Sequence, residues 1–374
     1  MLQRLRGRRG LNWLGRCAAR YALTQLSALA RRPLCGPTLA TLITNYDCNL
    51  RCHMCRMAEV GAARNPTASA PLNTADMLGL LQDLSDLGAM GIGFTGGEPL
   101  LRRDLAQLLH HAASLGLITH LNTNGTLLTE QVAEEIISTG LQSLNISLDG
   151  ATASTHDAVR RVPGAFDRAV AAFHAVAAVR KRQAGGPRVK MVSVLSEANA
   201  GEVEGITRLA AELGADCVEF IPEQPFASPT AADPNATKKL APQARKEIER
   251  AVRTLMELKE KTVLIENSWR MLRLFAPSFE GKPSPLNCHA ALNSITVDAY
   301  GDVYPCLPRV NWQPPLANLL TSSLYDIWYR QDLWARRKDT LACRDCYLNC
   351  HTELNLLFQP CRRIPETVPF DAGP

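Results

Sequence analysis

The sequence predicts an α/β fold: a partial (β/α)6 barrel of the TIM type, followed by a small cysteine-rich domain. Between residues 39 and 221, short apolar runs alternate six times with helical patterns or turn residues. Strands that alternate with helices indicate a parallel sheet. Because the crossovers are right-handed, six such units form an open sheet or a partial barrel. After residue 285 the pattern changes, and six of the 12 cysteines lie there.

Each predicted unit is a strand followed by a helix. Strands are expected at 39–44, 91–95, 117–122, 141–148, 189–195 and 217–221. Helices are expected at 73–87, 104–115, 130–138, 166–182 and 202–213. Asn73 or Thr74 is suited to cap the first helix, and Gly88 follows its end. Cysteines, glycines, asparagines and an aspartate follow the strand ends, which form the functional face of such barrels.

Three further segments complete the predicted organisation. Residues 1–37 form a basic leader, residues 38–225 the barrel, residues 226–285 a bridge, and residues 286–374 the C-terminal domain. The bridge is expected to contain a charged helix at 242–261. The C-terminal domain is expected to contain a hairpin with strands 294–297 and 302–306 around Ala299-Tyr300-Gly301, and a short helix at 324–334.

The leader holds eight arginines and no acidic residue in its first 32 positions. Leu14, Cys17, Tyr21 and Leu29 recur at rough helical spacing. We expect a helix that packs against the protein with its arginines in water. The alternative is an amphipathic helix that makes weak contact with an anionic membrane surface through residues 1–32.

Composition narrows the class of protein. Apolar residues make up 46% and charged residues 21% of the 374, as in soluble globular proteins. The eight arginines of the leader exceed the net charge of +5 of the whole chain, so the remaining residues carry no excess of positive charge. That part of the chain therefore shows no basic surface for nucleic acid. No apolar stretch of about 18 residues predicts a transmembrane helix. No signal peptide is evident and the cysteines cluster at metal-ligand spacings, which favours a reducing cytoplasm.

Cys48, Cys52 and Cys55 form a C-x-x-x-C-x-x-C triplet directly after the first strand. Thiolates are soft ligands suited to iron–sulfur clusters, zinc or copper(I). Three ligands leave one coordination position open, as a metal site needs for chemistry on a bound molecule. On spacing alone, a zinc site is the alternative.

The triplet, with Asn49-Leu50-Arg51 inside it, resembles the signature of the radical S-adenosylmethionine (SAM) superfamily. The resemblance covers roughly residues 39–225. It implies a 4Fe–4S cluster on the three thiolates and SAM on the open iron. One-electron cleavage of SAM then gives methionine and a 5′-deoxyadenosyl radical that abstracts hydrogen from a substrate. A flavodoxin- or ferredoxin-type protein would supply the electron.

The same resemblance assigns residues to SAM. Gly96-Gly97-Glu98-Pro99 is similar to the family's glycine-rich segment; glycines let the backbone approach a ligand, and Glu98 can accept from the SAM ammonium. The other candidates are polar residues after the third to fifth strands: Asn122, Asn124, Ser147, Asp149, Ser196 and Asn199. Each of these residues is equally suited to a turn or a helix cap. No general base is predicted.

The C-terminal candidates for metal ligands are Cys288, Cys306, Cys343, Cys346, Cys350 and Cys361. The first four resemble the start of SPASM and twitch domains, which carry auxiliary iron–sulfur clusters. Four thiolates close a cluster site, so at least one auxiliary cluster is expected. Whether Cys350 and Cys361 bind a second auxiliary cluster, with His351 or Glu353 as a further ligand, stays open. Zinc bound by the C-terminal cysteines is the alternative. Cys17, Cys35 and Cys217 are expected to be buried small hydrophobes.

The implied function is an oxidative modification of a peptide or protein side chain. The alternative is a small molecule such as a sugar, an alcohol or a lipid-linked intermediate, which the short stretch before Cys48 favours because it leaves little room for a peptide-recognition module. Leu307 stands where sulfatase-maturing relatives have an acid, which argues against that activity. A non-catalytic electron carrier is a remote alternative, since it would not need the glycine-rich segment.

Overall fold

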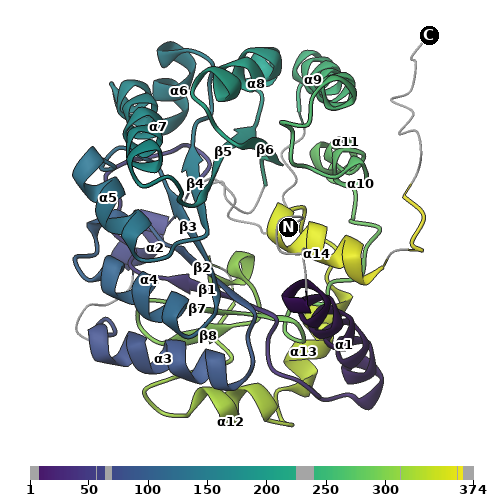
Figure 1. Ribbon diagram of the computed structural model, residues 1–374. Coiled ribbons are helices and arrows are strands. Elements are labelled where there is room, and N and C mark those ends of the chain that lie inside the picture. Colours follow the sequence, from purple (N-terminus) through teal and green to yellow (C-terminus); the bar gives the residue numbers. More distant parts are fainter. Residues whose placement is uncertain are drawn as a thin grey trace.

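The computed structural model describes residues 8–55, 57–63, 70–224, 240–311, 313–359 and 361–364. Residues 1–7, 226–239 and 365–374, which belong to the predicted leader, bridge and C-terminal domain, lie outside this set. One nine-stranded sheet has the order β6-β5-β4-β3-β2-β1-β7-β8-β9. Figure 1 shows helices α3 to α8 arranged around the outer side of the curved part of this sheet.

The six predicted barrel strands are confirmed to within about two residues, and all six run parallel. They are β1 (Leu39–Ile43), β2 (Gly91–Thr95), β3 (Ile118–Thr123), β4 (Ser143–Ser147), β5 (Arg188–Leu195) and β6 (Cys217–Pro222). The predicted helices are also confirmed. They are α3 (Thr74–Asp86), α4 (Leu105–Ser114), α5 (Glu130–Ser138), α7 (Ala165–Arg182), α8 (Val203–Glu212) and α9 (Pro242–Lys261).

The start of α3 shows why these boundaries could be predicted. Asn73 is the N-cap: its side-chain oxygen accepts from the Asp76 N–H at 3.0 Å. The Asp76 carboxylate accepts from the Asn73 N–H, also at 3.0 Å, which completes a capping box. Gly88 follows the helix with φ of 78°, in the left-handed region that favours glycine.

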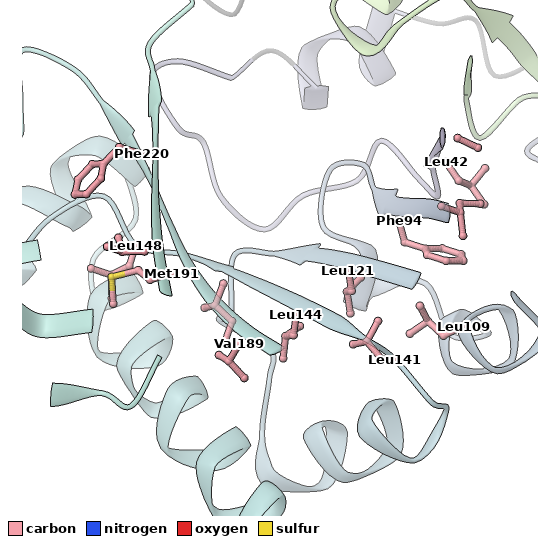
Figure 2. Close-up of a cluster of buried hydrophobic side chains, with 14 of the residues drawn as sticks. Leu42, Phe94, Leu109, Leu121, Leu141, Leu144, Leu148, Val189, Met191 and Phe220 are labelled. Atoms are coloured by element: carbon pink, nitrogen blue, oxygen red, sulfur yellow. The ribbon is translucent and has the colours of Figure 1, made fainter. Parts of the chain in front are cut away.

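Alternating side chains divide the barrel between core and interior. One face of each strand packs against the helices, as Figure 2 shows for Phe94, Leu121 and Leu144, and these side chains are fully buried. The opposite face carries polar residues on neighbouring strands, where Asn145 donates to Asn122 at 2.8 Å. The sheet therefore turns a polar interior toward the carboxyl ends of its strands.

The leader forms helix α1 (Arg8–Ala30), which packs on the protein as expected. Arg20 donates to the Gly36 carbonyl at 2.6 Å and to the Gly88 carbonyl beyond α3. Tyr21 stacks on Phe358 with 5.4 Å between the ring centroids. The expectation that Cys17 is buried is wrong: it is partly exposed, because it lies on a helix with only one packed side.

The predicted C-terminal hairpin is confirmed, and it continues the barrel sheet. Strand β7 (Ser294–Val297) pairs parallel with β1, and β8 (Asp302–Tyr304) pairs antiparallel with β7. Strand β9 (Ala317–Asn318) completes the edge. The hairpin and its cysteines are therefore fixed directly beside the strand that leads into the cysteine triplet.

The single helix predicted at 324–334 is wrong. Helix α12 (Leu324–Tyr329) ends where Arg330 adopts an extended conformation with ψ of 125°, and α13 (Trp334–Ala342) begins after it. An ion pair of 2.8 Å between Arg330 and Asp332 lies in this break. The described residues also form helices that were not predicted: α2 (Met57–Ala63), α6 (Ala153–Arg160), α10 (Trp269–Leu272), α11 (Phe275–Phe279) and α14 (Asn349–Phe358).

No single helix of the described chain combines the length and apolar character needed to cross a membrane. Helices α6 and α7 meet those criteria only when taken together, as a pair bent by 107°.

Candidate active site

A cavity of about 340 Å³ opens at the carboxyl ends of the barrel strands, within the range typical of small-molecule sites. Three regions of the chain line it. The triplet loop contributes Cys48, Leu50, Cys52, Met54, Cys55 and Met57; the strand ends contribute Thr95, Gly96, Gly97, Glu98, Asn122, Thr123, Asn124, Ser147, Val192, Val194, Ile221 and Pro222. Arg160 of α6, Gln224 just after β6, and Leu307, Pro308 and Leu348 of the C-terminal region complete the lining.

Buried apolar side chains hold the cysteine loop in place while its three thiols face the cavity. Leu50 is 3% and Met54 7% exposed. The Leu50 N–H lies 3.4 Å from the Cys48 sulfur, and the Met57 N–H donates to the Cys55 sulfur. Burial raises the pKa of the Cys48 thiol, so a metal that binds here displaces a proton.

Helix α6 supports this loop from the side. Its last carbonyl groups, at Val159 and Arg160, accept from the His53 N–H at 3.1 Å and the Arg51 N–H at 3.2 Å. These carbonyls have no partner within the helix, so the loop satisfies them. On the other side, His53 Nε2 lies 3.4 Å from the Glu223 carboxylate just beyond β6. Glu223 raises the pKa of His53.

The two glycines of the glycine-rich segment lie against the backbone of the cysteine loop. A Cβ atom on Gly97 would lie 2.0 Å from the Asp47 carbonyl oxygen, and one on Gly96 would lie 2.5 Å from that of Asn45. The Gly97 N–H donates to the Asn45 carbonyl at 2.9 Å, and the Glu98 N–H to the Asp47 carbonyl at 2.7 Å. Side chains at either glycine would push the thiols out of position.

Six of the ten predicted SAM-contacting residues line the cavity. They are Gly96, Gly97, Glu98, Asn122, Asn124 and Ser147. The other four, Pro99, Asp149, Ser196 and Asn199, are buried just outside the lining. Asn199 donates to the carbonyls of Asp149 at 2.7 Å and Val194 at 2.8 Å, so it joins the ends of β4 and β5. Contact of these residues with SAM stays a prediction.

The auxiliary cysteines gather beside the same cavity. Cys288, Cys306 and Cys343 pack together with Ala290. Burial raises the pKa of the Cys346 thiol, and the nearby thiols of Cys306 and Cys288 add to this effect. The Leu348 N–H lies 3.4 Å from the Cys346 sulfur, and the Ala290 N–H donates to the Cys288 sulfur. Cys350 and Cys361 are both exposed. Leu307, next to Cys306, and Leu348 reach the cavity.

These donor sets fit iron–sulfur clusters. Four of the thiols accept from the backbone N–H two residues later, at Cys48, Cys55, Cys288 and Cys346. Such N–H donors stabilise thiolate charge and tune clusters. Within the described residues, no three His, Cys, Asp or Glu side chains are grouped to hold a single metal ion. Cys48, Cys52 and Cys55 would hold the cluster that binds SAM, and Cys288, Cys306, Cys343 and Cys346 an auxiliary one.

Sequence reasoning missed Arg160 and Leu348. Arg160 lines the cavity, 108 residues from the cysteine that it contacts. Helix α6 was not predicted, and its local signal was the N-cap Thr152, whose side chain accepts from the Thr155 N–H. Leu348 lies between Cys346 and Cys350, which were both predicted as metal ligands. Its position two residues after Cys346 was the sequence feature that could have identified it.

Comparisons with known proteins agree with this geometry. The Radical SAM superfamily model matches residues 42–210, and the model of the iron-sulfur cluster-binding domain SPASM matches residues 288–347. The chain is 34% identical over 180 residues to the AdoMet-dependent heme synthase of Methanosarcina barkeri, which covers 48% of this chain and 49% of that protein. It is 28% identical over 328 residues to the PqqA peptide cyclase of Rhizobium meliloti. That alignment covers 83% of this chain and 80% of the cyclase.

The fold is also shared with a solved structure. The chain aligns with Streptococcus suis SuiB bound to precursor peptide SuiA with a TM-score of 0.63 and 17% identity, over 83% of this chain and 69% of that one. The chain spans about half the length of the heme synthase. The chain therefore carries a radical SAM domain at residues 42–210 and a SPASM iron–sulfur domain at residues 288–347.

Proposed function

We propose that this protein reductively cleaves SAM and uses the resulting radical for an oxidative modification of a peptide or protein side chain. One observation carries the proposal: the three loop thiols, the glycine-rich segment and residues beside the auxiliary cysteines all line one cavity. A non-catalytic electron carrier would have no need for such a cavity between two cysteine sets.

The residues of the chain have separate tasks in this activity. A 4Fe–4S cluster on Cys48, Cys52 and Cys55, with SAM on its open iron, would supply the 5′-deoxyadenosyl radical for hydrogen abstraction. Gly96 and Gly97 allow the glycine-rich segment to lie directly against the backbone of the cysteine loop. Leu307, Pro308 and Leu348 add apolar surface to the cavity lining, which helps to exclude water from a reactive species.

Protein acid–base chemistry is not needed for hydrogen abstraction, and the lining agrees with this. Among the described lining residues, the titratable side chains are the three cysteines, Glu98 and Arg160. Both oxygens of Glu98 are engaged in hydrogen bonds within the protein. Leu307 takes the position beside Cys306 and offers no base.

Cleavage of SAM is the direct test of this activity. Anaerobically reconstituted, dithionite-reduced protein should form 5′-deoxyadenosine from SAM, as measured by liquid chromatography. Cys52→Ala should abolish this product, whereas Cys17→Ala, which changes a cysteine outside both sets, should retain it. Absence of product with the wild type, or product that survives Cys52→Ala, would exclude the proposed activity.

A peptide substrate is supported by the extent of the similarity. The PqqA peptide cyclase aligns across both domains, whereas the heme synthase aligns over about half of this chain. The higher identity to the heme synthase favours the second candidate, a small molecule. An extract of the source organism should stimulate 5′-deoxyadenosine formation. Loss of this stimulation after protease treatment indicates a peptide, and its persistence indicates a small molecule.

Three further aspects of the proposal concern the surroundings of the protein. All 12 cysteines are free thiols, which supports a reducing cytoplasm. A flavodoxin- or ferredoxin-type protein would donate the electron. Weak contact of the leader with a membrane surface would use Leu26 and Leu29, which are 49% and 80% exposed, beside Arg31 and Arg32.

A further inference from the structure

Arg160 is a buried cation at the wall of the cavity. It is the last residue of α6 and only 8% exposed. Its Nη2 lies 2.6 Å from the Asp149 Oδ2, and its Nη1 donates to the Cys52 sulfur at 3.5 Å. Among the described residues that line the cavity, Arg160 is the only lysine or arginine.

Arg160 is held firmly in this position. Asp149 exposes none of its surface, and its other carboxylate oxygen accepts from the Val194 N–H at 2.8 Å. The Asp149 N–H donates to His156 Nδ1 at 3.0 Å, one turn before Arg160 on the same helix. The Arg160 carbonyl accepts from the Arg51 N–H at 3.2 Å. Side chain and backbone of Arg160 thus both fix its guanidinium relative to the cysteine loop.

The donor to Cys52 differs in charge from the donors to the other two loop thiols. Cys48 and Cys55 accept from neutral backbone N–H groups of Leu50 and Met57. Charge-assisted hydrogen bonds are roughly twice as strong as neutral ones. Hydrogen bonds to the sulfurs and local charge are among the factors that set the reduction potential of an iron–sulfur cluster.

We propose that Arg160 supplies the charged hydrogen bond to the Cys52 thiolate and makes the reduction potential of the loop cluster less negative. An external one-electron donor that reduces a cluster held there would add negative charge near the Cys52 sulfur, and the Arg160 guanidinium at 3.5 Å would stabilise that charge. Glu98, a buried carboxyl group that lines the same cavity, opposes this effect, while Asp149 anchors Arg160 through the 2.6 Å ion pair. The inference rests on the proposed cluster at Cys48, Cys52 and Cys55, and Arg160 acts as a positioning and charge-compensating residue.

The test compares reduction potentials without SAM, because SAM binding would add a second effect. Wild type, Arg160→Gln, Arg160→Lys and Arg161→Gln are reconstituted as full chains and titrated with dithionite under EPR. The loop signal is the one that is absent from a Cys48, Cys52 and Cys55 triple alanine variant. Arg161 is the matched control, because it is the exposed neighbour on the same helix end.

The expected result is a more negative potential of the loop signal in Arg160→Gln alone, with Arg160→Lys close to the wild type because it keeps the charge. An unchanged potential in Arg160→Gln would overturn the inference. So would an equal shift in Arg160→Lys and Arg160→Gln, since that would show a structural role and no effect of charge.

Loss of the loop cluster from a variant is also decisive. Changes to residues that hydrogen-bond to metal ligands commonly cost 10–100-fold in metal affinity. If iron is lost in Arg160→Gln but retained in Arg160→Lys, the result supports a role for the positive charge at Cys52. Iron lost in both Arg160 variants but retained in Arg161→Gln contradicts it. If the wild type itself holds no loop cluster, the proposed function is wrong, and this inference is wrong with it. If all variants hold it with one potential, only this inference fails.

Discussion

The carboxylate of Glu98 accepts a hydrogen bond from the Asn124 N–H at 2.8 Å, which ties the loop after β2 to the end of β3. Its other oxygen accepts from the Leu100 N–H at 3.0 Å and the Thr123 hydroxyl at 2.7 Å. The side chain exposes none of its surface. Glu98 therefore shapes the cavity wall even before any ligand binds.

Replacing Glu98 by glutamine should lower the free energy of unfolding by about 1–3 kcal/mol, because an NH2 group would face a backbone N–H donor in a buried site. Urea unfolding of the metal-free protein measures this change. Glu135→Gln on the exposed face of α5 is the control and should alter stability little. Equal stability of the two variants would show that Glu98 does not hold the strand ends.

His156 should make stability depend on pH. Burial and the neighbouring Arg160 lower its pKa to about 4. The unfolded chain binds this proton below about pH 6.5, whereas the folded protein binds it only near pH 4. The free energy of unfolding should therefore fall by about 2 kcal/mol from this residue between roughly pH 7 and pH 5.

The matched variant for this pH dependence is His156→Asn, which keeps an acceptor for the Asp149 N–H but does not titrate. Urea unfolding at several pH values should give a flatter dependence for this variant. The same slope in wild type and variant would contradict the lowered pKa of His156.

Asn349 should couple helix α14 to the barrel. Its Nδ2 donates to the Glu219 Oε1 at 2.9 Å and to the Phe220 carbonyl at 2.8 Å. Asn349→Ala leaves these acceptors without that donor, which should cost about 1–3 kcal/mol. Asn349→Asp should cost at least as much, because a second carboxylate then faces Glu219. Hydrogen exchange in α14 should rise in both variants; protection equal to the wild type would refute this coupling.

Cys288, Cys306, Cys343 and Cys346 should hold one cluster without Cys350 and Cys361. Wild type should then contain roughly eight irons per chain, as expected for two 4Fe–4S clusters. Cys350→Ala and Cys361→Ala should keep that content, and Cys346→Ala should lose about half of it. Iron analysis after reconstitution measures this. Loss of iron in Cys350→Ala or Cys361→Ala would show that a second auxiliary cluster uses them.

Local patterns allowed the barrel elements to be predicted, but contacts between distant segments could not be. Asn73 reveals the start of α3 because its capping box lies within four residues. Helix α6 ends at Arg161 in a left-handed conformation with φ of 56°. This end could not be predicted, because the position holds an arginine where glycine is the usual residue. The pairing of the four-residue strand β7 with β1 depends on tertiary packing. The contact between Arg160 and Cys52 depends on that packing as well.

The cavity residues also divide into those that local sequence patterns predict and those that depend on tertiary contacts. The cysteine spacing and the glycine-rich segment indicated the cofactor wall, since both act within a few residues. The roles of Asp149 and Asn199 could not be read from sequence, because turn-forming, capping and ligand-binding side chains look alike there. In the structure, Asp149 bonds to Arg160 and Val194, and Asn199 bonds to strand-end carbonyls.

The central claim is that SAM binds at the cluster held by Cys48, Cys52 and Cys55. EPR spectra of the reduced protein with and without SAM test it most directly. In the wild type, SAM should change the signal of one cluster. In the triple alanine variant, the remaining auxiliary signal should not respond to SAM. A wild-type spectrum that SAM leaves unchanged, or an auxiliary signal that responds in the triple variant, would contradict the claim.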